Sequence, residues 1–166
     1  QTYYVHTVAT HTFQVSAKSK AMGGTAIALT GGAAGNAVTA TPTGSAALDC
    51  STAVPSLDTL WPPNHELVSF DVEGLIDPAG GSIMVSIDGI FQGELVNGKG
   101  DGNTSPDAEI IGTSTSSVRA ERTGSGNGRV YTVYFTASND DGAQCNGSVE
   151  IGVPSSRKRD AVNDGP

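Results

Sequence analysis

Residues 129–153 read RVYTVYFTASNDDGAQCNGSVEIGV, and this stretch decides the fold class. Two runs rich in Val, Tyr, Phe and Thr, Arg129–Ser138 and Gln144–Val153, flank the dipeptide Asp141-Gly142. Such residues suit the pleated surface of a sheet, and Asp-Gly tolerates the left-handed backbone that a tight turn needs. The stretch therefore predicts an antiparallel β-hairpin.

Further candidate strands precede this hairpin, separated by turn signals such as Asn97-Gly98 and Asn127-Gly128. The 22 glycines fit a chain of many short strands joined by turns. The candidate strands are Glu66–Val72, Ser82–Ile87, Ile90–Val96, Ala108–Gly112 and Ser116–Arg122, with Asp88-Gly89 interpreted as a turn between the second and the third. We therefore predict an all-β protein in which residues 49–154 form an antiparallel β-sandwich.

The chain has two cysteines, Cys50 and Cys145, with no CxxC spacing and no nearby His, so a metal site is not indicated. We expect them to form one disulfide that closes a long loop; the alternative is two unpaired buried thiols. The first residue is Gln1 rather than Met, which favours an exported, extracellular protein whose leader has been removed. A boundary within a longer chain would look the same.

The charge is unevenly distributed. The net charge of −8 argues against nucleic acid and anionic membrane surfaces as partners, because both attract clustered Lys and Arg. Residues 1–48 contain Lys18 and Lys20 and no acid, which gives +2, whereas residues 49–166 hold 17 acids and 7 basic residues, which gives 7 − 17 = −10. The two parts are therefore expected to have different surroundings.

The first eighteen residues alternate between a mainly apolar and a mainly polar side, which predicts one long strand. Such a strand is longer than a sandwich domain normally uses, so we expect part of it to pair outside the local fold. Residues 19–48 carry small side chains that bury little area, so we expect them to dock on the rest of the chain or on a neighbouring copy; the alternative is a flexible tether. We expect residues 1–48 to form an N-terminal strand extension and residues 155–166 a flexible tail.

This arrangement suits a subunit that lends its N-terminal strand to the next copy, so that a head-to-tail homopolymer grows into a filament or pilus. The expected donor residues are Tyr3, Val5, Phe13 and Val15. Two alternatives remain open. The segment can be an edge strand of its own sandwich, or part of a second small domain formed with residues 19–48.

Four motifs occur in order: WPPNH at 61–65, GDGNTSPD at 100–107, RAER at 119–122 and GNGRVY at 126–131. With them, residues 49–154 resemble a recurring immunoglobulin-like module of secreted bacterial proteins. The resemblance implies an extracellular immunoglobulin-like fold, often appended to larger surface proteins, and no enzymatic activity. Relatives often carry an acidic DPDGD-type turn where this chain has Asp77-Pro78-Ala79-Gly80-Gly81, so any calcium site there would be weaker here.

Three groups of polar or aromatic residues are candidate binding sites. Asp101, Asn103, Ser105 and Asp107 place oxygen atoms at alternate positions, as a calcium loop does, although Asx-turns explain the same residues. Trp61 and His65 form a possible sugar-binding platform, but a Trp plug at the end of the sandwich is the simpler interpretation. Arg119 and Glu121 can bind a ligand carboxylate or form a cross-strand ion pair.

The sequence gives little support for catalysis. It contains no GxSxG, HExxH or phosphate-binding glycine loop. His6 and His11 are five residues apart, which places them on opposite sides of a strand and disfavours a shared zinc ion. We therefore expect a non-enzymatic filament subunit. The alternative is an extracellular adhesion module that binds polysaccharide or a surface, with calcium as a possible stabiliser.

Overall fold

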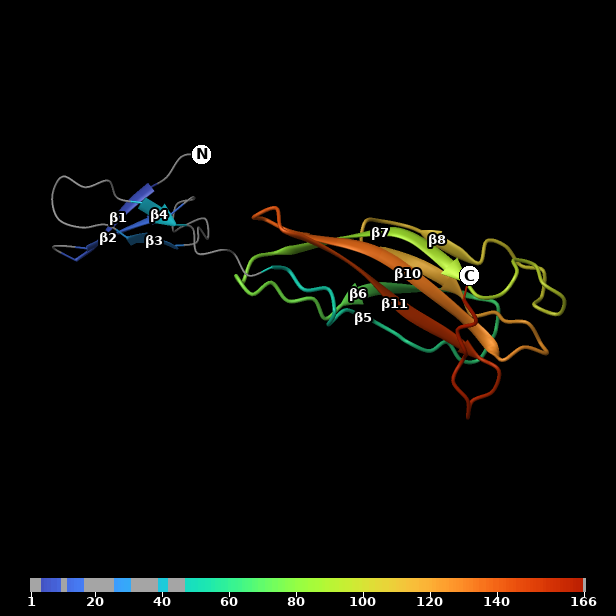
Figure 1. Ribbon diagram of the computed structural model, residues 1–166. Helices are drawn as coiled ribbons and strands as arrows, with labels where there is room; N and C mark the ends of the chain where they lie inside the picture. Colours follow the sequence, from blue (N-terminus) through green and yellow to red (C-terminus); the bar gives the residue numbers. More distant parts are fainter. Residues whose placement is uncertain (1–3, 10–11, 17–25, 31–38, 42–46, 166) are drawn as a thin grey trace. The chain divides into compact units, whose positions relative to one another are not determined.

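The computed structural model describes residues 4–9, 12–16, 26–30, 39–41 and 47–165. These residues form strands and loops and include no helix (Figure 1). The chain divides into two compact units, one of residues 1–47 with 78–81 and the other of residues 48–77 with 82–166. The sheet β1-β2-β3-β4 belongs to the first unit, and the other two sheets belong to the second.

The second unit is an antiparallel β-sandwich, as predicted. Its three-stranded sheet has the order β11-β10-β7, and its four-stranded sheet has the order β5-β6-β9-β8. The strands are β5 (Val54–Pro55), β6 (Leu67–Glu73), β7 (Ile83–Gln92), β8 (Ala108–Ile110), β9 (Thr115–Arg119), β10 (Gly128–Asn139) and β11 (Gln144–Pro154).

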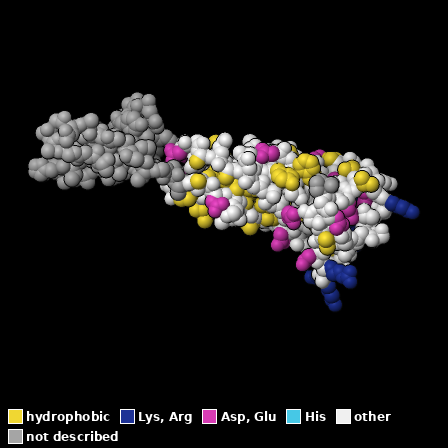
Figure 2. Space-filling view, viewed as in Figure 1, with side chains coloured by type: hydrophobic (Ala, Val, Ile, Leu, Met, Phe, Trp, Pro, Cys, Tyr) yellow, Lys and Arg dark blue, Asp and Glu magenta, His cyan; other side chains and the backbone are white. Residues whose placement is uncertain are grey.

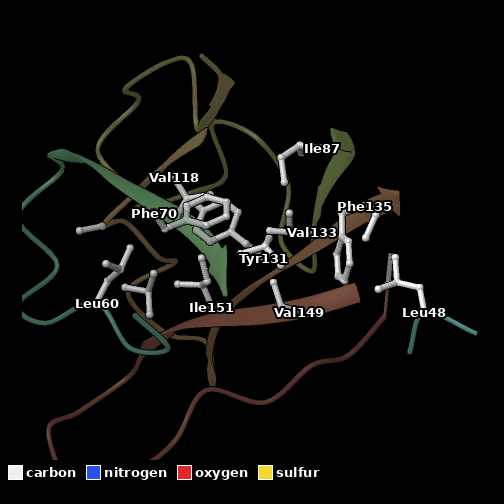
Figure 3. Close-up of a cluster of buried hydrophobic side chains, with 14 residues drawn as sticks. Leu48, Leu60, Phe70, Ile87, Val118, Tyr131, Val133, Phe135, Val149 and Ile151 are labelled. Atoms are coloured by element: carbon white, nitrogen blue, oxygen red, sulfur yellow. The ribbon is translucent and has the colours of Figure 1, made fainter. Parts of the chain in front are cut away.

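Side chains from both sheets meet in one hydrophobic core (Figure 3). Phe70 and Val118 enter it from the four-stranded sheet, and Tyr131, Phe135 and Ile151 enter it from the three-stranded sheet. All five are almost completely buried. The two-residue alternation of β10 produces this burial, because every second residue faces the other sheet.

The predicted hairpin is confirmed in β10 and β11, which pair from Arg129 opposite Val153 to Ser138 opposite Gln144. At its tip the side-chain oxygen of Asn139 accepts hydrogen bonds from the backbone N–H groups of Asp141 and Ala143. Gly142 has φ of +82°, the left-handed conformation that the Asp-Gly signal predicted. Local turn chemistry thus sets the register of the longest strand pair.

The interpretation of Asp88-Gly89 as a turn is wrong. One continuous strand, β7, runs from the first predicted segment into the second and pairs with β10 on both sides of Asp88. It ends at Gln92, so the strand predicted as Ile90–Val96 is too long at its C-terminal end. The register of this pair shifts between Tyr134 and Phe135, opposite Gly89, so the glycine marks an irregularity within a strand. A glycine signal alone does not separate a bulge from a turn, and the apolar residues on both sides favour continued pairing.

The expected disulfide joins Cys50 to Cys145, with their Cα atoms 5.8 Å apart. It attaches the segment before β5 to β11. Next to it, a Cβ atom at Gly147 would lie 2.6 Å from the Phe135 ring and 3.2 Å from Cys50 Cβ, so only glycine fits there. The disulfide and this close approach hold one end of the sandwich together.

The first unit contains β1 (Tyr4–Ala9), β2 (Thr12–Ser16), β3 (Ala26–Thr30) and β4 (Thr39–Thr41). β1 and β2 pair antiparallel, with Val5 opposite Val15 and Thr7 opposite Phe13. Two strands therefore replace the single long strand predicted over residues 1–18, because chain reversal lets the backbone groups of each strand pair locally. The donor candidates Val5, Phe13 and Val15 lie in this pair, and Tyr3 lies outside the described residues.

The C-terminal segment, predicted as a flexible tail, makes specific contacts with the sandwich. The side-chain amide of Asn163 donates to Glu150 Oε1 at 2.7 Å, and Asn127 donates to Asp164 at 2.9 Å. A Cβ atom at Gly128 would lie only 2.9 Å from the Cβ atom of Ala161, so the C-terminal segment packs closely against this glycine.

In the described parts of the chain, no helix has the length and apolar character needed to cross a membrane.

Candidate functional site

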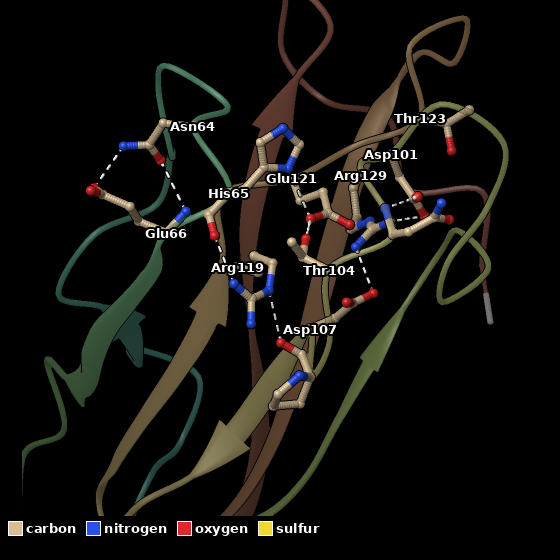
Figure 4. A network of polar contacts seen from close by, with 12 residues as sticks. Asn64, His65, Glu66, Asp101, Thr104, Asp107, Arg119, Glu121, Thr123 and Arg129 are labelled. Carbon is tan, nitrogen blue, oxygen red and sulfur yellow. Dashed lines mark hydrogen bonds and ion pairs between the residues drawn. The ribbon is translucent and has the colours of Figure 1, made fainter.

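A fully buried arginine, Arg129 at the start of β10, organises one end of the sandwich (Figure 4). Its Nη1 atom donates to Asp107 Oδ2 at 2.8 Å, and its Nε atom donates to Glu94 Oε2 at 3.2 Å. Its Nη2 atom lies 3.6 Å from Asp101 Oδ2. Three carboxylates from residues 94–107 thus converge on one guanidinium group, which fixes this long loop to the sheet.

Further hydrogen bonds tie the same loop down. Glu94 Oε2 accepts from the backbone N–H of Thr123 at 2.7 Å, and Gln92 Nε2 donates to Asp107 Oδ2 at 2.9 Å. The loop is therefore held from both sides. Asp101 Oδ2, Asp107 Oδ1 and Arg129 Nη2 are buried without a hydrogen bond. The 3.6 Å between Arg129 Nη2 and Asp101 Oδ2 is too long for one, so the two groups interact only through their charges.

Burial and charge shift the pKa values of two groups in this network. Burial by itself lowers the pKa of Arg129, but a hydrogen bond with Tyr131 and the attraction of Tyr131 and Asp107 outweigh it, and the pKa is raised above its usual value. Burial raises the pKa of Tyr131 to about 12, because the opposing hydrogen bond from Arg129 has the smaller effect. Both groups therefore keep their protons far into the alkaline range.

Another buried acid, Glu121, lies beside this network (Figure 4). His65 Nδ1 is 2.9 Å from Glu121 Oε2, and the Thr104 hydroxyl donates to the same oxygen. A Cβ atom at Gly102 would lie 2.6 Å from His65 Cε1, so glycine lets the imidazole approach the loop. Three of the four motifs, which are far apart in sequence, meet at this contact.

Arg119 and Arg122 bind backbone carbonyl groups. Arg119 donates from Nε to the Pro106 oxygen at 2.8 Å and from Nη1 to the His65 oxygen at 2.7 Å. Arg122 donates to the carbonyl oxygens of Pro154 and Ser155 at 3.2 and 3.1 Å. Arg119 therefore does not form the expected cross-strand ion pair, whereas Glu121 contacts His65, which precedes β6. β9 ends at Arg119, and each side chain reaches a different loop.

The four calcium candidates do not face a common point. Asp101 and Asp107 are buried against Arg129, whereas Asn103 and Ser105 are exposed. Asp101 Oδ1 accepts the backbone N–H of Asn103 at 3.1 Å, which is the Asx-turn alternative. Among the described residues, no group of three or more His, Cys, Asp or Glu side chains is placed to hold a metal ion. The calcium prediction gains no support.

The structure contradicts the simpler interpretation of the WPPNH motif, in which Trp61 plugs the end of the sandwich. Trp61 is 42% exposed and does not plug the sandwich; the neighbouring Leu60, 4% exposed, fills that part of the core. Asn64 caps the entry to β6, because it donates to Glu66 Oε2 at 2.6 Å and accepts the Glu66 N–H at 3.2 Å. His65 is half-exposed and engaged with Glu121. Trp61 therefore stays available to a ligand, but His65 does not act beside it.

The edge of β7 leaves some core-facing side chains partly exposed. β7 ends the three-stranded sheet, and no described strand pairs with the outer side of Ile83–Ser86. A groove of about 550 Å³ follows this edge, lined by Val72, Thr113, Ser114, Ser138 and Ile83–Ser86. Ile83 and Val85 pack against the core but are only half-buried, and Met84 is 66% exposed. The groove thus gives an extended segment access to the core.

The surface of the sandwich unit differs along its length. In the space-filling view, basic side chains gather at one end, and apolar and acidic side chains are spread over the rest of the visible face (Figure 2).

The chain was compared with protein-family models, curated proteins and solved structures, and none of the three comparisons finds a match.

The sequence interpretation missed Arg129 as the centre of the network and the open edge of β7. A signal for Arg129 was present, since it shares the inward-facing side of its strand with Tyr131 and Val133. A cation at a core position requires carboxylates nearby, but Glu94 and Asp107 lie 35 and 22 residues away in sequence, and Asp107 was interpreted as a calcium ligand. The edge gave no local signal, because strand order depends on the whole chain.

Proposed function

We propose that the chain is a structural subunit of an extracellular bacterial filament or pilus, in which copies join by addition of a β-strand to the β7 edge. The observation that carries this proposal is the unpaired, uncharged edge of Ile83–Ser86 beside the apolar groove. Backbone groups along such an edge bind a further strand, and alternate side chains of that strand enter the groove.

The composition of this edge supports the proposal. Soluble proteins normally protect edge strands with charged residues, prolines or bulges. Residues 82–87 read SIMVSI and contain no charge and no proline. The irregularity in the pairing with β10 is at Asp88, directly after this segment. An added strand would also bury Ile83 and Val85 completely and so increase the hydrophobic stabilisation.

The N-terminal unit offers a matching strand. β1 (Tyr4–Ala9) ends its own sheet, so it needs no unfolding to add itself to the β7 edge of another copy. The sequence YVHTVA carries no acid and no lysine or arginine, which avoids placing a charge in the groove. The +2 charge of residues 1–48 opposes the −10 charge of residues 49–166 and would steer the donor toward its acceptor.

The proposed location and fold type rest on separate grounds. A disulfide such as Cys50–Cys145 persists in oxidising compartments, which supports an exported protein. The two-sheet sandwich and the four motifs support an immunoglobulin-like module of secreted bacterial proteins. Assembly through strand addition requires no cofactor and no catalytic group.

The test is a charge placed on the acceptor edge. Because Met84 is 66% exposed, Met84→Lys leaves the fold intact, and Ile110→Lys at the 52% exposed edge of β8 is the matched control. We expect Met84→Lys to raise the concentration for half-maximal assembly by about tenfold or more and Ile110→Lys to leave it unchanged. Sedimentation velocity and negative-stain images measure this. Equal assembly of all three proteins, or a wild type that stays monomeric at every concentration, contradicts the proposal.

A further inference from the structure

Two exposed aromatic rings lie together on the outer face of the sheet β11-β10-β7. Phe91 of β7 is 54% exposed, and Tyr134 of β10 is 44% exposed. Their ring centroids are 5.5 Å apart, with an angle of 87° between the planes. The two rings together form one contiguous aromatic patch on this face.

The backbone fixes the position of this pair. Gly89 lies opposite Tyr134, and a Cβ atom at Gly89 would be 3.4 Å from Phe91 Cε2. The Phe91 ring therefore lies back over the glycine and against Tyr134. Since both residues belong to strands rather than loops, the rings are held in place before any ligand binds, which reduces the entropy cost of binding.

Polar side chains flank the rings along the strands. On one side, the Thr136 hydroxyl lies 2.8 Å from Asp88 Oδ2 and 3.1 Å from Asn146 Oδ1, so one polar row crosses all three strands. On the other side, Asn163 Nδ2 lies 2.7 Å from Glu150 Oε1 and 3.4 Å from the Thr132 hydroxyl. The face thus carries a polar row on one side of Tyr134, and on the other side Phe91 shares its cross-strand row with Thr132 and Glu150.

We propose that this face binds a neutral polysaccharide chain. The apolar face of a sugar ring stacks on Tyr134 and Phe91, and its hydroxyl groups hydrogen-bond to Asp88, Asn146 and Glu150. This goes beyond the proposed assembly, because it uses the face of the sheet and not the edge of β7. A glycan site at Trp61 is a different site, on the segment before β6.

The charge of the face selects the occupant. It carries the exposed carboxylates of Asp88 and Glu150, and the three strands have no exposed Lys or Arg among their described residues. An anionic polymer is therefore repelled. An apolar protein surface would have to desolvate two carboxylates without a cation, whereas sugar hydroxyls donate hydrogen bonds to carboxylates. A neutral, hydroxyl-rich chain complements both the charge and the rings.

Native affinity electrophoresis tests the proposal, with hydroxyethylcellulose, xylan, laminarin and dextran as neutral polymers and polygalacturonate as an anionic one. We expect at least one neutral polymer to retard the wild type and polygalacturonate not to retard it. Phe91→Ala and Tyr134→Ala should each weaken retardation by about tenfold, and Tyr134→Phe, which keeps the ring, should retain it.

Met84→Ala, at the far end of β7, and Trp61→Ala are the controls, and both should bind like the wild type. Melting temperatures identify any variant that fails to fold. If Phe91→Ala or Tyr134→Ala fails to fold, the binding of the other variant tests the proposal. Three results overturn the proposal: no retardation by any neutral polymer, loss of retardation with Trp61→Ala alone, or a change of oligomeric state in Tyr134→Ala without polysaccharide, which would assign the face to a protein contact. A failure of assembly in Met84→Lys leaves this proposal untouched.

Discussion

Arg129 is a single residue on which the whole end of the sandwich depends. It is completely buried, and its guanidinium group is the only cation within 4 Å of Glu94, Asp101 and Asp107 among the described ion pairs. Removing one partner of a buried ion pair leaves an uncompensated charge in a poorly solvated place, which is more costly than replacing the entire pair.

Arg129→Met should therefore lower the free energy of unfolding by about 3–5 kcal/mol, because three carboxylates, two of them buried, lose their cation. Urea unfolding at neutral pH measures the loss. The control is Arg157→Met, at an exposed position in the C-terminal segment, which should change stability by no more than about 0.5 kcal/mol. Similar losses in both variants would show that the network contributes nothing of its own.

Tyr131 gives the fold an alkaline limit. Its pKa is raised to about 12 in the folded protein, whereas an unfolded tyrosine ionises near 10. Between these two pH values the unfolded chain loses a proton that the folded protein keeps, so stability falls as pH rises. The decrease from this residue should reach about 2–3 kcal/mol between pH 10 and 12 and be absent below pH 9.

The comparison variant is Tyr131→Phe. It also loses the hydrogen bond from the hydroxyl to the Arg119 carbonyl, 2.9 Å long, so its stability at pH 8 is lower. The slope of stability against pH above 10, measured by urea unfolding, therefore decides. A slope as steep in the variant as in the wild type would assign the alkaline loss to other groups.

Among the elements, the β10–β11 hairpin was predictable and the exact form of β7 was not. The hairpin follows from alternation on both sides of an Asp-Gly turn, and these are local properties. In β7 the same kind of dipeptide, Asp88-Gly89, stays inside a strand because β10 provides partners on both sides of it. Whether a glycine ends a strand or bends it depends on the neighbouring strand.

The disulfide links two elements that local hydrogen bonds do not join. It closes a loop with a sequence separation of 95 residues, from the segment before β5 to β11. The double variant Cys50→Ala/Cys145→Ala should be less stable by about 3–5 kcal/mol, because its unfolded chain gains the entropy of the open loop. Urea unfolding of the variant and of the reduced wild type should agree. A loss below about 1 kcal/mol would mean that strain in the bridge offsets this entropy.

At the scale of the whole molecule, the core of the sandwich and the proposed donor strand belong to different units. The sandwich has its own core, built from residues 48–153. Deleting residues 1–18 should therefore leave a folded sandwich with an unchanged main unfolding transition but abolish polymerisation, because no donor strand remains. Calorimetry measures the transition, and negative-stain images measure the polymers. Polymers of unchanged length would contradict donation by β1.

From the sequence alone, the all-β class, the hairpin and the disulfide pairing were determined. Each of these follows from features that the sequence shows directly. Apolar and polar residues alternate with the two-residue period of a strand, turn dipeptides mark the chain reversals, and there are two cysteines to pair. The sequence did not determine the arrangement of the donor residues. We expected them in one long strand, but β1 pairs with β2.

Only the tertiary structure decided which polar residues meet and which surfaces stay open. Arg129 contacts Asp107 although 22 residues separate them in sequence, and His65 contacts Glu121 across 56 residues. No local sequence pattern predicts either contact. The free edge of β7 and the paired rings of Phe91 and Tyr134 likewise follow from the order and register of the strands. Strand order and register are set by the balance of all contacts in the folded chain, so a property that depends on them appears only after folding.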